Sequence, residues 1–179
     1  MIADTRNLIT SAALQLSSAG ANPEQLAVST PARRLLGILP RSASYKKAGE
    51  GFLLGALVVT THGDVFEPGL IIRASLKVFP GHQAQSAQER VELRRKLLAA
   101  KFPEDSAVLI DPRRLPIDDL EQLAKENGPL VLREIVVDGI RTQQLLVRWM
   151  STASDSDLRP LEDYLNERVE LAITGIAEA

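Results

Sequence analysis

The chain has 179 residues, of which 45% are hydrophobic and 25% charged, and its formal net charge is -2. These values are typical of one globular domain and exclude a disordered chain. The sequence has no cysteine and two histidines, which excludes disulfides, thiolate catalysis and Cys-ligated zinc and disfavours a His-rich metal site. We therefore expect no metal and no cofactor.

The N-terminus carries Asp4 where a secretory signal would be basic, and no segment reaches 18 uninterrupted apolar residues. These patterns predict a cytoplasmic protein with no membrane partner. The charge is uneven, because residues 1–101 hold 13 Lys or Arg against 7 Asp or Glu, whereas residues 102–179 hold 8 against 16. Such a split indicates either a basic surface for an anionic partner or contacts between the two halves, within one copy or between copies.

The N-terminal region shows three helix signals. The first helix carries Leu8, Ile9, Ala12 and Leu16 at helical spacing and ends before Gly20. Asn22-Pro23-Glu24 resembles a second helix start, and Thr30-Pro31 a third, whose helix has to end before Pro40. We expect residues 1–30 to form a peripheral helical segment and residues 31–179 a single domain.

A first hairpin is predicted from residue 52 onward, where aliphatic and β-branched residues dominate. His62-Gly63-Asp64 supplies its turn, and Pro68-Gly69 is expected to split the returning strand. The pair Ser86 and Glu89 then has the spacing of a capping box and opens a helix that runs to about Lys101. A short buried strand at 106–111 and a short helix at 117–126 follow.

A second hairpin surrounds Asp138-Gly139, which is typical of a type I′ turn. A two-residue loop predicts that Val137 lies opposite Ile140, Val136 opposite Arg141 and Leu132 opposite Leu145. This register places the following residues on one apolar face: Leu130, Leu132, Val136, Leu145, Val147 and Trp149. The last helix is expected to begin near Pro160, with an apolar stripe on one side and acidic residues on the other.

Together these elements predict an α+β fold. We expect an antiparallel sheet of about five strands built on two hairpins, with helices packed mainly on one face and a helical N-terminal segment.

Three patterns suggest chemistry without completing a site. Ser44 and Lys47 match S-x-x-K, but the S-D-N and K-T-G elements of the acyl enzymes that use this pair do not occur. His62 beside Asp64, or His82, would need a distant nucleophile to act in a hydrolase. The acidic residues near 118 and 155 lie at predicted helix starts, where the exposed amides of the first turn favour negative charge. We therefore expect no catalytic residues, and a hydrolase centred on Ser44 with Lys47, or on His62, is the least favoured alternative.

Between Glu24 and Glu50 the chain carries five basic residues and no acidic one. Together with basic residues of the predicted helix 86–101, they define a candidate anion-binding patch made of Arg33, Arg34, Arg41, Lys46, Lys47, Arg90, Arg94 and Lys101. A pI near 5.8 and an aromatic content of 4% disfavour nucleic acid as the ligand. A phosphate-bearing small molecule or nucleotide is the alternative that this patch leaves open.

The stretches RRLLGILPRSASYKKAGEGFLLGALVVTTHGDVFEPG and RPLEDYLNERVELAI resemble a family of small bacterial proteins without an assigned activity. The resemblance covers about residues 31–173 and implies a small cytoplasmic bacterial domain, with no catalytic residue to carry over. From the residues themselves we expect a non-catalytic interaction or regulatory module. It would self-associate, through an exposed strand edge or the last helix, or bind another protein.

Overall fold

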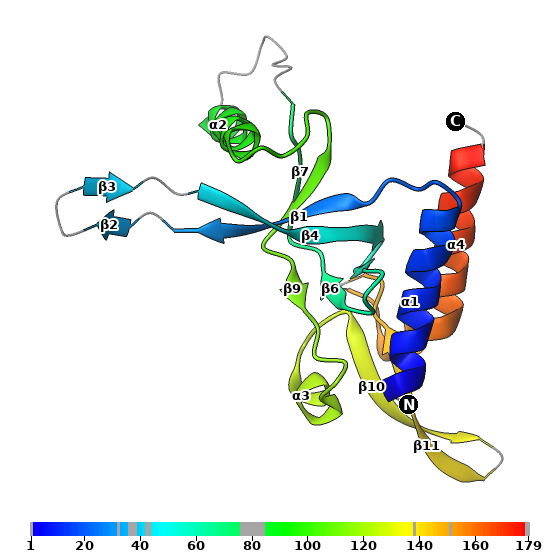
Figure 1. Cartoon of the computed structure of the whole chain (residues 1–179). Helices are drawn as coiled ribbons and strands as arrows, with labels where there is room; N and C mark the ends of the chain where they lie inside the picture. Colours follow the sequence, from blue (N-terminus) through cyan, green and yellow to red (C-terminus); the bar gives the residue numbers. More distant parts are fainter. Residues whose placement is uncertain are drawn as a thin grey trace. The chain divides into compact units, whose positions relative to one another are not determined.

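The structure is a computed structural model that describes residues 2–31, 33–35, 39–41, 44–75, 85–137, 139–150 and 152–177 (Figure 1). It describes only the backbone of residues 33–35, 39–41, 85–87 and 137. The fold is α+β, as predicted, with four α-helices in the described residues, a mostly antiparallel sheet of seven strands and a sheet of three. The expected number of about five strands was therefore approximate. None of the described helices is long and apolar enough to cross a membrane.

The chain divides into two compact units. The first unit comprises residues 1–23, 51–67 and 113–179, and the second comprises residues 24–50 and 68–112. The order in the large sheet is β7 (Leu70–Arg73), β8 (Ala107–Ile110), β1 (Glu24–Thr30), β4 (Ser44–Leu54), β5 (Leu57–Val59), β6 (Val65–Glu67), β9 (Arg113–Arg114). β1 and β8 are parallel, and β4 contributes residues to both units.

In the first unit, α1 (Ile2–Ser18) packs beside α4 (Leu161–Ala177). The three-stranded sheet contains β10 (Leu130–Val137), β11 (Ile140–Val147) and β12 (Arg159–Pro160), and the unit also contains α3 (Leu120–Lys125) and a 3-10 turn at Asp155–Asp157. The core draws on α1, β5, β10, β11 and α4, and its most buried members include Ile9, Leu57, Tyr164, Val147 and Leu123.

The second unit has a smaller core of its own. Its helix α2 (Gln85–Ala99) contributes Leu97, which packs with Phe102 and with apolar residues of β1, β7 and β8. The unit also holds the short hairpin of β2 (Arg33–Leu35) and β3 (Leu39–Arg41), in which the backbone register pairs Arg33 with Arg41.

The predicted register of the second hairpin is confirmed, because Val137 pairs with Ile140, Val136 with Arg141 and Leu132 with Leu145. Asp138 of the predicted turn lies outside the described residues. The predicted apolar face is buried near the base of the hairpin, where Leu130, Leu145 and Val147 belong to the core, whereas Val136 near the tip is 67% exposed. Trp149, which follows the end of β11, is 40% exposed. The hairpin is therefore longer than the core that covers it.

Two helices predicted in the N-terminal region are wrong. Residues 24–30 form β1, and residues within 31–41 form β2 and β3. The helix-start signals are local, whereas β1 is held by pairing with β8, in which Gln25 lies opposite Val108. Tertiary pairing thus overrides a weak local preference. Whether residues 31–179 form a domain of their own stays a prediction.

Other predicted elements are confirmed with shifted ends: the first, middle and last helices are α1, α2 and α4, and the buried strand is β8. The turn at His62-Gly63-Asp64 joins β5 to β6, and after Pro68-Gly69 the chain enters β7, which pairs with β8. The sequence did not predict the tighter turn at Gly55 between β4 and β5. Gly55 has φ +64°, and a Cβ there would lie 2.6 Å from Oη of Tyr164.

Tyr164 fixes this turn from α4. Its side chain is 1% exposed, its hydroxyl donates to the carbonyl of Leu54 at 2.8 Å, and the amide of Ala56 donates to the hydroxyl at 2.9 Å. One phenol therefore satisfies two backbone groups of the turn. A buried phenol normally needs such partners.

We predict that Tyr164→Phe destabilises the first unit by about 1–3 kcal/mol, because it leaves a buried amide and a carbonyl without partners. Denaturant unfolding followed by the fluorescence of the single tryptophan, Trp149, measures this loss within the same unit. Tyr45→Phe, at a half-buried tyrosine of the second unit, is the matched control. Equal effects of the two substitutions would contradict the proposed role of the hydroxyl.

Candidate functional site

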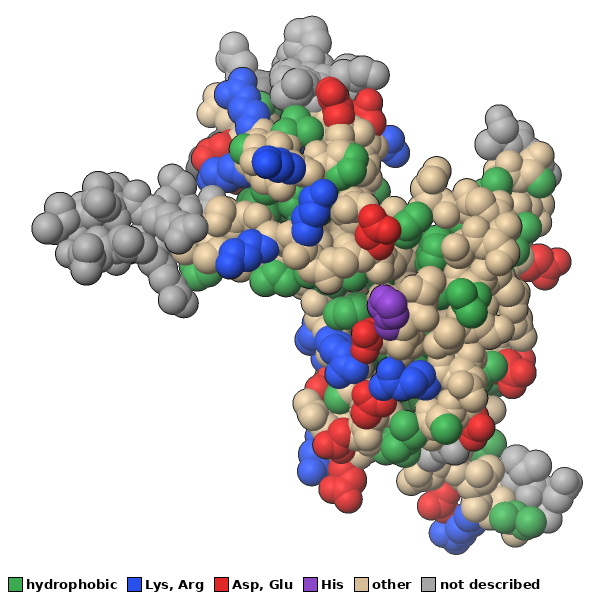
Figure 2. Space-filling view, in the orientation of Figure 1, with side chains coloured by type: hydrophobic (Ala, Val, Ile, Leu, Met, Phe, Trp, Pro, Cys, Tyr) green, Lys and Arg blue, Asp and Glu red, His purple; other side chains and the backbone are tan. Residues whose placement is uncertain are grey.

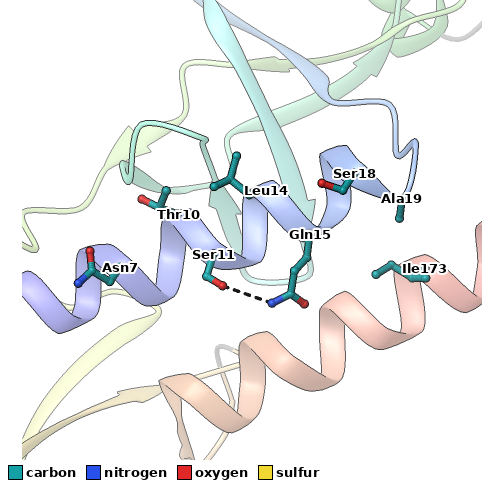
Figure 3. A pocket seen from close by; sticks show the side chains of 8 residues that line it. All are labelled: Asn7, Thr10, Ser11, Leu14, Gln15, Ser18, Ala19 and Ile173. Carbon is teal, nitrogen blue, oxygen red and sulfur yellow. Dashed lines mark hydrogen bonds between the residues drawn. The ribbon is translucent and has the colours of Figure 1, made fainter.

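A shallow open groove of about 640 Å³ follows α1 in the first unit (Figure 3). Seven of its lining residues come from α1 and the residue after it, and one comes from α4: Asn7, Thr10, Ser11, Leu14, Gln15, Ser18, Ala19 and Ile173. In Figure 3, Ser11 and Gln15 point toward α4, and the Gln15 amide donates to the Ser11 hydroxyl at 3.3 Å.

The helical period decides which side of α1 faces the groove. Ile9, Ala13 and Leu16 are buried in the core, so the residues about half a turn away face outward. These outward residues include Asn7, Ser11, Leu14 and Ser18, whose spacings of four, three and four residues align them along the helix. We call these four residues the α1 stripe. Its one large apolar member, Leu14, is 51% exposed.

The α1 stripe is electrically neutral in an acidic unit. Residues 7–23 contain no charged side chain, whereas the first unit as a whole has 16 Asp or Glu against 9 Lys or Arg. The neighbouring α4 exposes Glu162, Asp163 and Glu170. Because charged residues are depleted from the cores of protein interfaces, a neutral exposed helix face is a candidate contact surface.

The second unit is basic, with 12 Lys or Arg against 7 Asp or Glu. The uneven charge of the chain is therefore also an uneven charge of the two units, which have net values of +5 and -7. The acidic unit includes the N-terminal helix, and the basic unit ends at residue 112.

The residues of the predicted anion patch all belong to the second unit, but only part of the patch can be described. Lys46, Lys47, Arg90 and Lys101 are exposed and Arg94 is half-buried. The register places Arg33, Arg34 and Arg41 on β2 and β3, and their side chains lie outside the described residues. The structure adds Arg95, an exposed residue of α2 that the prediction omitted although it stands in the run Arg94-Arg95-Lys96.

β4 separates two residues that the sequence placed together. Successive side chains of a strand point to opposite faces, so Lys46 and Lys47 lie on opposite sides of β4. Lys47 Nζ lies 5.7 Å from the centroid of the Phe102 ring, which belongs to the core under α2. Lys47 therefore lies on the α2 side of the sheet and Lys46 on the other side.

The same alternation argues against a Ser44-Lys47 catalytic pair. The S-x-x-K spacing brings serine and lysine together on a helix, but three residues apart on β4 they point to opposite faces. His62 is exposed, and its carbonyl accepts a hydrogen bond from Arg6 at 3.3 Å. The carboxylate of Asp64 accepts two hydrogen bonds from Arg114, at 3.0 and 2.7 Å. His82 lies outside the described residues.

The acidic residues near 118 have structural partners. Asp118 accepts from Arg6 at 2.5 Å and from Arg114 at 3.3 Å, and Asp119 caps α3 by accepting from the amide of Gln122 at 2.9 Å. The hydrogen bond from Arg6 is the main reason why the pKa of Asp118 is lowered, and Arg114 adds to the effect. Within the described part of the chain, no group of three potential metal-ligating side chains could hold an ion.

The acidic residues near 155 are also engaged. Asp155 accepts from Arg133 at 2.6 Å, and Asp157 accepts from the amide of Ser154 at 3.0 Å. The hydroxyl and amide of Ser154 lower the pKa of Asp157. These carboxylates thus stabilise local structure.

No protein-family model matches this chain, and neither the curated proteins nor the solved structures give a significant match. The resemblance stated from the sequence therefore stays a prediction.

We predict that Arg6→Gln raises the pKa of Asp118, because the substitution removes the largest cause of its lowering. A lowered folded-state pKa stabilises the fold above the unfolded-state pKa, and this stabilisation is lost as the pH falls through the folded value. The pH range in which Arg6→Gln changes the stability of the fold through Asp118 therefore lies below about pH 4. Titration of side-chain carboxyl carbons by NMR measures the change, with Asp157, which has no arginine partner among its causes, as an internal control. An unchanged pKa of Asp118 would contradict the contact.

Proposed function

We propose that the protein is a non-catalytic interaction module that self-associates through the α1 stripe. The observation that carries this proposal is the groove along α1, which is uncharged and exposes Leu14 in a unit of net charge -7. When a second helix covers an exposed leucine on a neutral helix face, no charged group loses its hydration and apolar surface is removed from water, which favours the contact.

For a second copy as the partner, charge favours α1 over α4 as the contact. Two copies of an acidic unit repel each other wherever their carboxylates meet, and α4, with Glu162, Asp163 and Glu170, would bring such residues together. A two-fold contact of α1 with α1 opposes neutral residues of the α1 stripe on both sides. This favours α1 over the last helix, which the sequence had suggested.

The composition of the α1 stripe suits helix packing. Ser11 and Ser18 are small and flank Leu14 along the helix. In an antiparallel pair of helices, a leucine of one copy fits between small residues of the other and lets the backbones approach closely.

The size of the surface predicts a weak dimer. A helix of 17 residues is about 25 Å long, and a face about 10 Å wide covers roughly 250 Å² on each copy. Stable interfaces bury about 800 Å² on each partner. We therefore expect a dissociation constant in the micromolar range or above. At such an affinity the fraction of dimer changes with protein concentration, which suits a regulatory role.

We predict that Leu14→Asp weakens self-association at least about tenfold, because it places two unpaired carboxylates in the interface. Sedimentation velocity over micromolar to millimolar concentrations measures the shift in the monomer-dimer equilibrium. The wild-type protein is expected to show a mass that rises with concentration from 19.5 kDa toward twice that value.

Leu171→Asp is the matched control for this experiment. Leu171 is 56% exposed on α4 and does not line the groove, so the substitution changes the same residue type and the same net charge outside the α1 stripe. A wild-type protein that stays monomeric at all concentrations overturns the proposal. Equal weakening by the two variants excludes the α1 stripe as the contact.

The cytoplasmic setting and the bacterial origin expected from the sequence belong to this same proposal. A small interaction module that works without cofactors fits such a setting. Fractionation of cells that express the tagged full chain tests the location.

A further inference from the structure

A second pocket of the first unit, of about 510 Å³, lies beside α4. Trp149 lines it from the segment after β11, residues 156–160 line it from the segment that leads into α4, and Glu167 and Arg168 line it from α4 itself. We call it the α4 pocket. It shares no residue with the groove along α1, and small-molecule sites usually have volumes of about 300–1,000 Å³.

Three of the residues that line the α4 pocket are apolar. Trp149 is 40% exposed, and Leu158 and Pro160 are half-buried. A tryptophan ring presents a large and rigid apolar surface. The α4 pocket can therefore remove the apolar part of a ligand from water, which favours binding.

The guanidinium of Arg168 is the charged group that distinguishes the α4 pocket. Its carbon Cζ lies 5.3 Å from the centroid of the Tyr164 ring, and the hydroxyl of Tyr164 is itself held by the turn at Gly55. Within the described residues, Nε of Arg168 is buried without a hydrogen-bond partner. The guanidinium is therefore held in place but lacks the full set of partners that a buried charged group normally has.

The other arginines of the first unit differ from Arg168, because each contacts a carboxylate of the same unit: Arg6, Arg113, Arg114, Arg133, Arg141, Arg148 and Arg159. Figure 2 shows acidic and basic side chains next to one another around α3, in this unit. Within the described ranges, Arg168 has no carboxylate at ion-pair distance. Its positive charge is therefore available to an external anion.

The remaining charges of the α4 pocket limit the charge of that anion. Arg159 forms an ion pair with Glu167, so its charge is already balanced. Asp157, which accepts from the amide of Ser154 at 3.0 Å, adds a second carboxylate to the lining. A phosphate dianion is repelled by both carboxylates, whereas a single carboxylate meets less repulsion when it pairs with Arg168. A planar guanidinium also donates two parallel hydrogen bonds to a carboxylate.

We propose that the α4 pocket binds a small molecule that carries one carboxylate on an aromatic body. The carboxylate pairs with the guanidinium of Arg168, and the ring packs against Trp149. Binding gives a partner to an arginine that has no carboxylate and covers a tryptophan that otherwise faces water. It does not depend on self-association, because the α1 stripe contributes no residue to the α4 pocket.

Trp149 is the single tryptophan of the chain, so its fluorescence reports directly on the α4 pocket. Titration of the full chain with benzoate and with hydrocinnamate is expected to change this fluorescence in a saturable way, with dissociation constants of about 1 mM or below. The matched neutral amides, benzamide and hydrocinnamamide, are expected to bind at least about tenfold more weakly, because they cannot form a charge-assisted pair with a guanidinium.

Three results overturn the proposal. The first is the absence of a saturable change with both carboxylates up to about 10 mM. The second is equal binding of the carboxylates and their amides, which excludes an ionic contact. The third is inorganic phosphate that displaces hydrocinnamate at equal concentration, which assigns the pocket to phosphate.

Substitutions of Arg168 locate the contact. Arg168→Gln is expected to weaken hydrocinnamate binding at least about tenfold, and Arg168→Lys, which keeps the charge but loses the planar fork, is expected to have an intermediate effect. Arg141→Gln makes the same substitution at an exposed arginine that does not line the α4 pocket, and binding is expected to stay unchanged. Equal weakening by Arg141→Gln attributes the effect to total charge and excludes Arg168 as the anchor.

Trp149→Leu tests the apolar contact independently, with binding followed through the NMR signals of hydrocinnamate itself. We expect binding to weaken several-fold, because the leucine covers less of the ligand ring. Undiminished affinity excludes the packing against Trp149. This variant also tests the α4 pocket if Arg168→Gln does not fold, because the side chain of Trp149 is exposed and does not belong to the core.

Discussion

β4 imposes the constraint on which the organisation of the chain depends, because one strand of eleven residues serves two units. Residues 44–50 are exposed or half-buried and carry Lys46, Lys47 and Glu50, whereas residues 51–54 are almost entirely buried. The change falls at Gly51, where a Cβ would lie 2.8 Å from Cγ1 of Val58. The strand can continue into the tightly packed core of the first unit only because this position lacks a side chain. A basic surface and an apolar core thus follow each other without a linker.

Arginines organise the first unit around this strand and its turns. Arg6 reaches from α1 to the carbonyl of His62 and to Asp118, and Arg114 joins Asp118 to Asp64. Arg113 contacts Glu67 and Glu126. Exposed ion pairs contribute little singly, but a network with several fixed partners orients the elements that it joins. The acidic residues near 118 therefore act as structural partners.

The sequence predicted elements that depend on local patterns and did not predict those that depend on distant pairing. The register of β10 with β11 follows from Asp138-Gly139 and from alternating residues within one short segment. The local pattern predicts a helix at residues 24–30, but this segment forms β1 because it pairs with β8, more than 80 positions away. No local pattern reveals such a pairing. The candidate surfaces likewise combine features that are visible in the sequence with features that only the folded structure shows. The absence of charge from residue 7 to residue 23 is visible in the sequence, but only packing shows that Leu14 faces outward. The pI could not reveal that folding sorts acidic and basic residues into different units.

The hairpin of β10 and β11 extends beyond the core that covers its base, and this gives its hydrogen bonds unequal lifetimes. Near Leu130 and Val147 the ladder lies under buried side chains, so its amides exchange with solvent only when the unit opens. Near Val136 and Ile140, which are 67% and 69% exposed, a two-stranded ribbon has little packing to hold it. Amide exchange should therefore quicken along the hairpin from base to tip, so that the outer ladder opens many times for each opening of the base.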